Sequence, residues 1–285
     1  MIAAGLAFLA GGQPAAQSQS LADVLKLSAV YVAEFRKQLS GIVAEETYKQ
    51  DIAYTARIGG GSGQSRLLRS DLLLVKPADS ERYVELRDVF EVDGEPVRDR
   101  EARVETLLGH QVTRDSDSRL GEIIAASARY NIGSITRTIN TPLMSLIFLD
   151  ETNQKRFGFK HVEKTTPVFA DAKDKAANDA PVFRVSTEMW TVEYAERGRN
   201  TIIKGPDGRD RPAHGRFWIN PSNGSVLISE LIVDTGGVIA TVTVSYQSEP
   251  LMGFLVPVEM RESYIRTGER ISGRAEYGRF RPIQK

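Results

Sequence analysis

The clearest pattern in the chain is a two-residue alternation of apolar and polar positions in its C-terminal third. The alternating segments are Val238–Tyr246, Val256–Tyr264 and Ile271–Phe280. Such alternation is typical of strands with one buried and one wet face. Because the connections are short, we predict an antiparallel meander whose apolar face is covered by helices. The apolar register of these strands contains Val242, Val244, Val258, Met260 and Tyr277.

Extended segments also occur earlier in the chain. They are Ile42–Tyr54, Leu67–Val75, Tyr83–Val92, Phe183–Tyr194 and Thr201–Lys204. Turn residues separate several of them, including Asp93-Gly94 and the glycine cluster 59–63, since glycine and aspartate favour tight turns. The sequence therefore predicts a sheet with strands from both halves of the chain.

Helical spacing marks the N-terminal region and the middle of the chain. Ser20 is a good N-cap for a helix that begins at Leu21 and ends at Gly41. A helical insertion over residues 98–156 would contain Arg98–Leu108, Ser118–Tyr130 and Leu143–Leu149. Pro142 suits the first turn of the last of these helices. The fold class that follows is α+β, with a curved antiparallel sheet covered by the N-terminal helix and the middle helical group.

The stretch GRFWINPSNGSVLISE, residues 215–230, places Asn-Pro-Ser-Asn-Gly between two apolar runs. Proline favours a turn position with φ near −65°, and glycine a position with positive φ. We predict a hairpin between Phe217–Asn220 and Ser225–Asp234, with Gly224 at positive φ. These residues are explained by a turn without any ligand.

The N-terminal residues suggest export. The first 22 residues are uncharged, and the apolar run Ile2–Ala10 is followed by small residues. This resembles the apolar core and cleavage zone of a signal peptide. The basic segment that normally precedes the apolar core is missing between Met1 and Ile2, so the true start could lie upstream. We predict a signal-like segment over residues 1–19, a single domain over 20–285, and a periplasmic or secreted bacterial protein.

Several segments resemble an uncharacterised family of exported bacterial proteins, best known from acidobacterial genomes. They are YVAEFRKQLSGIVAEETY (31–48), RLLRSDLLLV (66–75), RDVFEVDGEPVRDR (87–100), SARYNIG (127–133), HGRFWINPSNGSVLISE (214–230) and VPVEMRESY (256–264). The strand plan is also similar to the periplasmic lipoprotein-carrier superfamily (LolA-like, RseB-like). That resemblance implies a half-open barrel with helices at its mouth. It transfers no binding residue.

Charge and composition exclude several classes of function. Lys plus Arg and Asp plus Glu each total 37, so there is no basic excess for nucleic acid. The chain has no cysteine, which removes thiolate catalysis and zinc-thiolate sites. The three histidines, His110, His161 and His214, show no metal-ligand spacing, and no dinucleotide loop, P-loop or nucleophile elbow occurs. We therefore predict no metal, no cofactor and no integral membrane segment.

Two carboxylates stand out as candidates for chemistry, Asp71 and Asp88. Asp88 shares the face of Val84 and Leu86 in its strand, and burial raises the pKa of an unpaired carboxyl. One interpretation is an ion pair with Arg69 or Arg87, and the other is a general base of a hydrolase. Because arginines crowd the same segments, the ion pair is favoured.

The function predicted from these patterns is non-covalent binding of a hydrophobic ligand, such as an acyl chain or a lipidated polypeptide. Residues of the short apolar helix would cover the sheet as a lid. An alternative is a scaffold or interaction module that binds an envelope protein and no small molecule. The sequence predicts no enzymatic activity and leaves the oligomeric state open. The candidate ligand-binding residues are Val242, Val244, Val258, Met260, Tyr277, Leu143 and Phe148.

Overall fold

A computed structural model of the chain describes residues 19–54, 63–76, 82–102, 105, 116–162, 189–205 and 207–283. Its helices are α1 (Leu21–Leu39), α3 (Ser116–Ala128), the 3-10 helix η1 (Met144–Leu149) and α4 (Glu151–Gln154). Its strands are β1 (Ile42–Tyr54), β2 (Gln64–Val75), β3 (Val84–Val92), β4 (Glu95–Pro96), β5 (Phe157–Val162), β6 (Trp190–Glu196), β7 (Ala213–Ile219), β8 (Val226–Asp234), β9 (Val238–Glu249), β10 (Phe254–Arg266) and β11 (Glu269–Pro282).

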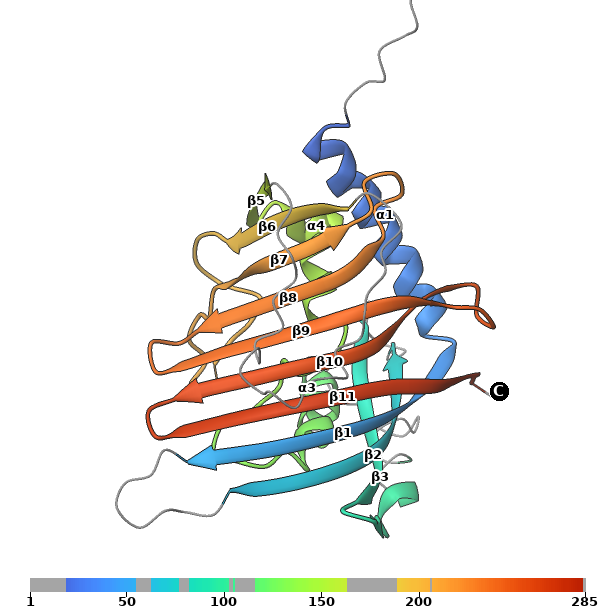
Figure 1. The fold of residues 1–285 in the computed structure, drawn as a ribbon, viewed down its shortest axis with the longest axis vertical. Coiled ribbons are helices and arrows are strands. Elements are labelled where there is room, and N and C mark those ends of the chain that lie inside the picture. The colour runs from blue at the N-terminus through green and yellow to red at the C-terminus, as the bar shows by residue number, and fades with distance from the viewer. Residues whose placement is uncertain are drawn as a thin grey trace, which may run out of the picture.

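These strands form one 11-stranded antiparallel sheet in the order β4-β3-β2-β1-β11-β10-β9-β8-β7-β6-β5 (Figure 1). Each arm of the sheet is a meander, as predicted from the alternation. The two arms are joined where β1 pairs with β11, the last strand of the chain. The sheet is not closed, because β4 and β5 stand at its two edges. It therefore confirms the α+β class with a curved, half-open antiparallel sheet.

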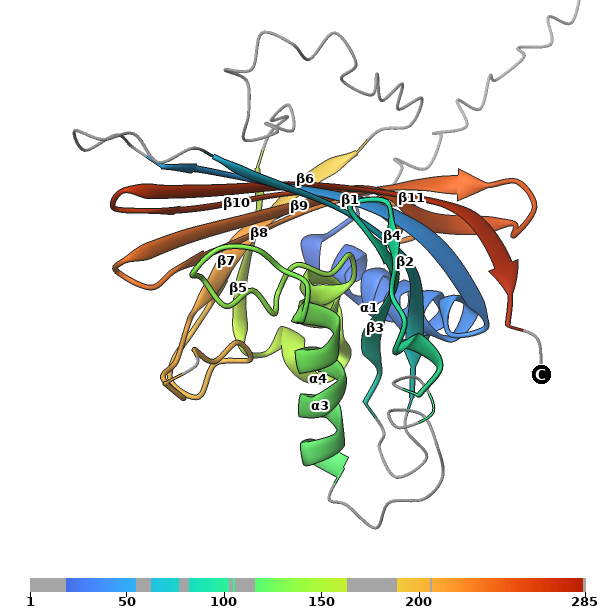
Figure 2. The ribbon, with the colours of Figure 1, turned by 90° about the horizontal axis from the view of Figure 1, so that it is seen from below.

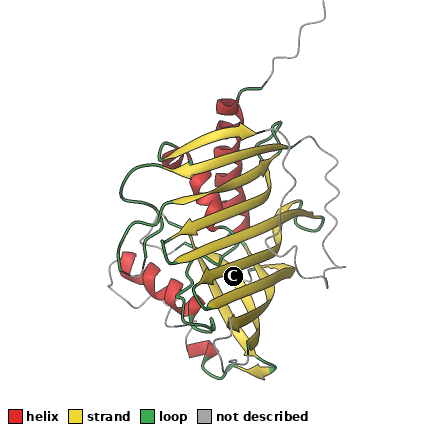
Figure 3. Ribbon diagram, turned by 60° about the vertical axis from the view of Figure 1, so that its left-hand side comes forward, coloured by secondary structure: helices red, strands yellow, loops and turns green. Residues whose placement is uncertain are grey.

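The helices α1, α3, η1 and α4 lie on one face of the sheet (Figure 2), as the sequence pattern required. β2 and β3 bend away from the plane of the other strands toward these helices, which gives the sheet its curvature. α1 contacts η1, β1, β2 and β10, whereas α3 packs against β3 (Figure 3). We call the helix-covered face the concave face. The apolar core lies between it and the helices.

The first helix begins where the sequence predicts. The Ser20 hydroxyl accepts from the backbone N–H of Asp23, and the Asp23 carboxylate accepts from the Ser20 N–H. This capping box satisfies two backbone donors that would otherwise lack partners at the helix start. The buried stripe of α1, which includes Val24, Val32 and Phe35, then faces the sheet.

α3 covers an edge of the sheet. The Ser127 hydroxyl accepts from the backbone N–H of Arg87 at 3.0 Å and donates to the Glu85 carbonyl at 3.2 Å. Ile123 of the same helix packs with Leu86. Because β4 is only two residues long, β3 would otherwise expose most of its backbone donors and acceptors at this edge.

The hairpin predicted at residues 215–230 is confirmed, with β7 and β8 as its strands and a positive φ of 75° at Gly224. The structure adds a second reason for glycine there. A Cβ atom at Gly224 would lie 2.3 Å from the carbonyl carbon of Leu27 and 2.4 Å from the Ser28 nitrogen. The turn therefore packs directly on the backbone of α1.

Some predicted elements differ in the structure. Residues 144–149 form a 3-10 helix and not an α-helix, and residues 201–204 contribute only the isolated bridge between Lys204 and Asp210. A six-residue segment held by tertiary packing does not need α geometry. Of the predicted helix 98–108, residues 100–102 and 105 are helical, and the remainder lies largely outside the described residues. The signal-like segment except for Gln19, the glycine cluster 59–63 except for Gly63, and residues 183–188 also lie outside them.

Replacing Gly224 should be more harmful than replacing a glycine of equal φ in open space. Gly236 has the same φ of 75°, and a Cβ atom there would meet no neighbour within 4 Å. We expect Gly236→Ala to cost about 1 kcal/mol of unfolding free energy from backbone strain alone. Gly224→Ala should cost roughly 2–4 kcal/mol, because the turn must also move away from α1. Urea denaturation of both variants measures this, and equal losses would contradict the packing of the turn on the helix.

Candidate functional site

A cavity of about 320 Å³ lies beside the sheet between β3, α3, η1 and the segment 137–141. Just over half of its lining residues are apolar. These are Leu74, Tyr83, Val84, Leu120, Ile124, Ala128, Ile139, Leu143, Met144, Ile147, Ile202 and Ile203. The polar lining residues are Arg36, Arg82, Glu85, Arg87, Ser127, Arg137, Thr138, Asn140, Thr141 and Lys204. We call this space the α3 cavity.

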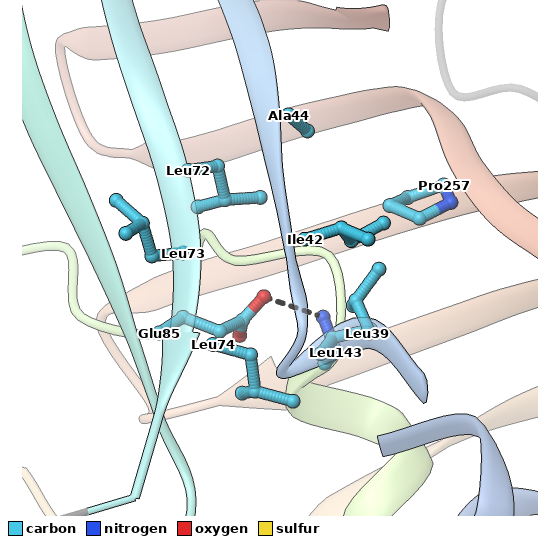
Figure 4. A pocket seen from close by; sticks show the side chains of 9 residues that line it. All are labelled: Leu39, Ile42, Ala44, Leu72, Leu73, Leu74, Glu85, Leu143 and Pro257. Atoms are coloured by element: carbon cyan, nitrogen blue, oxygen red, sulfur yellow. Dashed lines mark hydrogen bonds between the residues drawn. The ribbon is translucent and has the colours of Figure 1, made fainter. Parts of the chain in front are cut away.

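A second, much smaller void of about 10 Å³ lies behind Glu85 and Leu143 (Figure 4). Its other lining residues come from the end of α1, from β1 and β2, and from Pro257 of β10. A volume of this size corresponds to about one water molecule at most. Leu74, Glu85 and Leu143 line both spaces and so form the wall between them.

Glu85 is the acidic residue of this wall, and its pKa is shifted. It lies on β3 opposite Leu74, and its carboxylate accepts from the Leu143 backbone N–H at 3.1 Å (Figure 4). Burial raises the pKa of Glu85 to about 7, although hydrogen bonds from Thr141 and Leu143 and the charge of Arg87 act in the opposite direction. A carboxyl group that changes charge near neutral pH therefore lies at the entrance to η1.

Next to Glu85 on the concave face, Arg87 forms a fully buried ion pair with Glu46 of β1. The Arg87 guanidinium donates to the two Glu46 oxygens at 2.5 and 2.9 Å and to the Asn140 carbonyl at 3.0 Å. Ser70 donates a further hydrogen bond to Glu46 at 2.7 Å. Burial alone would lower the pKa of Arg87, but the Glu46 carboxylate raises it overall. The guanidinium therefore remains charged inside the protein.

A second buried ion pair joins Arg137 to Glu262 of β10, and both side chains have no exposed surface. Arg137 also donates to the Tyr48 hydroxyl at 2.8 Å, to Gln50 and to the Ile132 carbonyl. Tyr48 in turn donates to Glu262. We call the linked residues the buried polar network. Its members are Glu46, Tyr48, Gln50, Arg87, Arg137, Asn140 and Glu262.

The network holds the segment 137–141 against the sheet. Arg137 and Asn140 of this segment bond to β1 and β10, while the carbonyl of Asn140 accepts from β3. The pKa of Tyr48 is raised by burial and by the Glu262 charge, so the phenol stays neutral and can donate. Since Arg87, Arg137 and Asn140 also line the α3 cavity, the network supplies its polar wall.

The structure brings the predicted sheet residues together, but in the packed core. Met260 pairs with Val244 and with Ala275, and the Tyr277 hydroxyl donates to the Met260 sulfur at 3.8 Å. Val242 lies one step along the same face of β9 and is buried. Val258 sits at a register shift between β9 and β10 and is only half-buried. None of these five residues lines the α3 cavity.

Phe148 and Leu143, the ligand-binding residues predicted on the short apolar helix, lie in different environments. Phe148 is fully buried and packs its ring 4.8 Å from Phe157 and 5.5 Å from Tyr194. Leu143 lies at the boundary of the α3 cavity, together with Met144 and Ile147. One side of this segment therefore fills the space over the sheet, and the other side borders a cavity.

Asp71 and Asp88 lie directly opposite each other on β2 and β3, away from the α3 cavity lining. Arg100 bonds to both at 2.7 Å, and Arg281 of β11 bonds to Asp71 at 2.7 Å. The prediction of an ion pair is thus correct, but its arginine partner is neither Arg69 nor Arg87. The alternation of apolar and polar residues does not predict the register shift between β2 and β3 next to Arg69. It also does not predict that Arg100 approaches from outside the sheet.

The histidines and the helices bear on metal binding and membrane insertion. In the part of the chain that the structure describes, no group of three or more histidine or acidic side chains could hold a metal ion. His161 stacks on Trp190 with ring centroids 3.9 Å apart, His214 lies on β7, and His110 lies outside the described residues.

Among the described helices, none combines the length and apolarity required to cross a bilayer.

Comparison with known proteins gives little further information. No protein-family model matches the chain, and no curated protein matches it significantly. Among solved structures, the chain is similar to a domain from Vibrio parahaemolyticus described as a putative outer membrane lipoprotein-sorting protein domain. The TM-score is 0.39 with 12% sequence identity, over 90% of this chain and 92% of that one. At this TM-score the likeness carries no functional argument.

The titration of Glu85 should be visible in protein stability. Its pKa in the folded chain is about 7, raised from an ordinary value of 4.5, so the folded state holds the proton longer than the unfolded chain. The stabilising contribution is therefore complete below about pH 4.5 and is lost as the pH rises through about 7. Relative to wild type, Glu85→Gln should gain on the order of 3 kcal/mol over this window. Parallel pH profiles of wild type and variant would contradict a raised pKa.

Breaking the Glu46–Arg87 pair should be costly, and removing both charges should be less so. Arg87→Met leaves Glu46 buried without its partner, which typically costs roughly 3–5 kcal/mol. The double variant Glu46→Gln/Arg87→Met should recover a large part of that loss in denaturant unfolding.

A surface pair on the opposite face of the same sheet region provides the control. Arg69 and Glu45 are 2.7 Å apart, and Arg69 is about one-third exposed. Arg69→Met should cost only a small fraction of the loss at Arg87, because solvent screens the exposed pair. A similar loss for Arg69→Met and Arg87→Met would show that burial does not distinguish the two pairs.

Proposed function

We propose that this protein is an exported binding protein that holds a hydrophobic ligand non-covalently in the α3 cavity. The single observation that carries the proposal is the cavity itself. Its volume of about 320 Å³ lies at the lower end of the range for small-molecule sites. Just over half of its lining residues are apolar, which gives an apolar ligand surface on which to be buried. Export is inferred from the apolar N-terminal segment.

The size of the cavity favours a single acyl chain over a larger hydrophobic group. Apolar side chains of α3, η1 and the segment 202–203 would bury the chain, and this burial stabilises binding in proportion to apolar area. The polar network would orient the ligand without entering a covalent reaction. This proposal places the ligand beside η1, and not on the sheet face of Val244 and Met260.

A scaffold or protein-interaction module is the second candidate. The observation that favours it is the filled concave face, where Val244, Met260 and Phe148 are buried in a continuous core. A module of that kind would bind an envelope protein and leave the α3 cavity to water. A hydrolase based on Asp71 or Asp88 has less support, because Arg100 engages both carboxylates outside the α3 cavity.

Filling the cavity should abolish ligand uptake. We expect wild type to take up cis-parinaric acid, a fluorescent fatty acid, and Ala128→Trp to lose at least about 90% of that uptake, because the indole would occupy the cavity. Ala125→Trp is the matched control, since Ala125 is exposed on the same helix and does not line the cavity. Circular dichroism confirms that both variants are folded. Absence of uptake by wild type would reject this function in favour of the interaction module.

A further inference from the structure

The charges around the α3 cavity are strongly asymmetric. One lining residue is acidic, Glu85, whereas five are basic. The basic residues come from α1, the two residues before β3, β3 itself, the segment 137–141 and the isolated bridge between Lys204 and Asp210. They are Arg36, Arg82, Arg87, Arg137 and Lys204. A cavity with such a lining attracts anions and disfavours cations.

Four of these cations have carboxylate partners that lie behind the lining. Arg36 binds Asp150 through two nitrogens, Arg87 binds Glu46, Arg137 binds Glu262 and Lys204 binds Asp210. None of the four carboxylates lines the cavity. The ion pairs therefore keep the basic groups charged and positioned, while the cavity wall itself carries the positive side of each pair.

Two of the guanidinium groups also have an Nε–H that the surrounding protein encloses without a hydrogen bond. The Nε atoms of Arg36 and Arg137 are buried and have no hydrogen-bond partner within the described protein. Arg137 has no exposed side-chain surface, and an unsatisfied buried donor costs free energy comparable to a lost hydrogen bond. Near Arg36, the ring of Tyr83 lies 5.9 Å from the guanidinium carbon, so Arg36 and the Arg82–Tyr83 segment meet at one part of the cavity.

From this arrangement we propose that the ligand is an anionic amphiphile, with an acyl chain in the apolar part of the α3 cavity and a carboxylate facing its basic side chains. The inference rests on the proposed function and specifies the head group that the cavity selects. A carboxylate is an acceptor with two oxygens, which suits the basic side chains of the lining that keep accessible surface, Arg82 and Lys204. A cationic head group would meet the like charges of Arg36, Arg82 and Lys204, and a neutral alcohol would gain only an ordinary hydrogen bond.

Three ligands with the same chain and different head groups separate these cases. Isothermal titration would compare dodecanoate, dodecanol and dodecyltrimethylammonium below their aggregation concentrations. We expect dodecanoate to bind about tenfold more tightly than dodecanol, the gain of one charge-assisted hydrogen bond. Dodecyltrimethylammonium should bind more weakly than dodecanol.

Removing charge from the cavity wall should erase the preference and leave the chain site intact. We expect Lys204→Met and Arg82→Met each to weaken dodecanoate binding roughly threefold to tenfold, with dodecanol unchanged. Arg209→Met is the matched control, because Arg209 lies in the same loop as Lys204, is 81% exposed at its side chain and does not line the cavity.

The outcomes distinguish the two proposals. Equal affinity for dodecanoate and dodecanol, or tighter binding of the cationic ligand, would overturn the anionic selectivity while preserving hydrophobic-ligand binding. Failure of all three ligands to bind would overturn both. Loss of dodecanoate and dodecanol binding together in Lys204→Met would overturn the inference, since the residue would then support the cavity and not the head group.

Discussion

Two arginines buried under the middle of the sheet must each keep a carboxylate partner, and this constraint organises much of the molecule. Arg87 on β3 requires Glu46 on β1, and Arg137 requires Glu262 on β10. An unpaired charge at either place would cost several kcal/mol. The two pairs therefore fix the relative positions of the sheet strands and bind the segment 137–141 across them. That segment, in turn, leads into η1 and forms one wall of the α3 cavity.

The strands could be predicted from the sequence because their signals are local. Alternation of apolar residues, the Ser20 cap and the Asn-Pro-Ser-Asn-Gly turn each involve residues close together in the chain. The pairing of β1 with β11 has no such signal, since a meander pattern specifies neighbours only within each arm. The sequence predicted the positive φ of Gly224, but it did not predict the contact between the Gly224 turn and Leu27 of α1.

In the candidate site, too, local patterns could be predicted from the sequence and contacts between distant segments could not. Alternation correctly placed Val244 and Met260 on one face, yet it could not reveal that η1 and α1 fill the space over that face. The α3 cavity depends on side chains from separate parts of the chain, and Arg137 lies in an irregular segment without periodicity. Glu46 and Glu85 offered a weak signal, because each is a carboxylate in an extended segment. Their burial became evident only once their partners Arg87 and Leu143 were located.

The joining of β1 to β11 also has a consequence for the order in which the chain can fold. Ile42 pairs with Pro282, so the central seam of the sheet closes a loop of well over two hundred residues. Closing long loops before their contacts form carries an entropic cost, and topologies dominated by distant contacts fold slowly. Until β11 has left the ribosome, one edge of β1 has no partner. The β1 edge that later pairs with β11 is therefore an open strand edge during synthesis, and such an edge can pair with other chains.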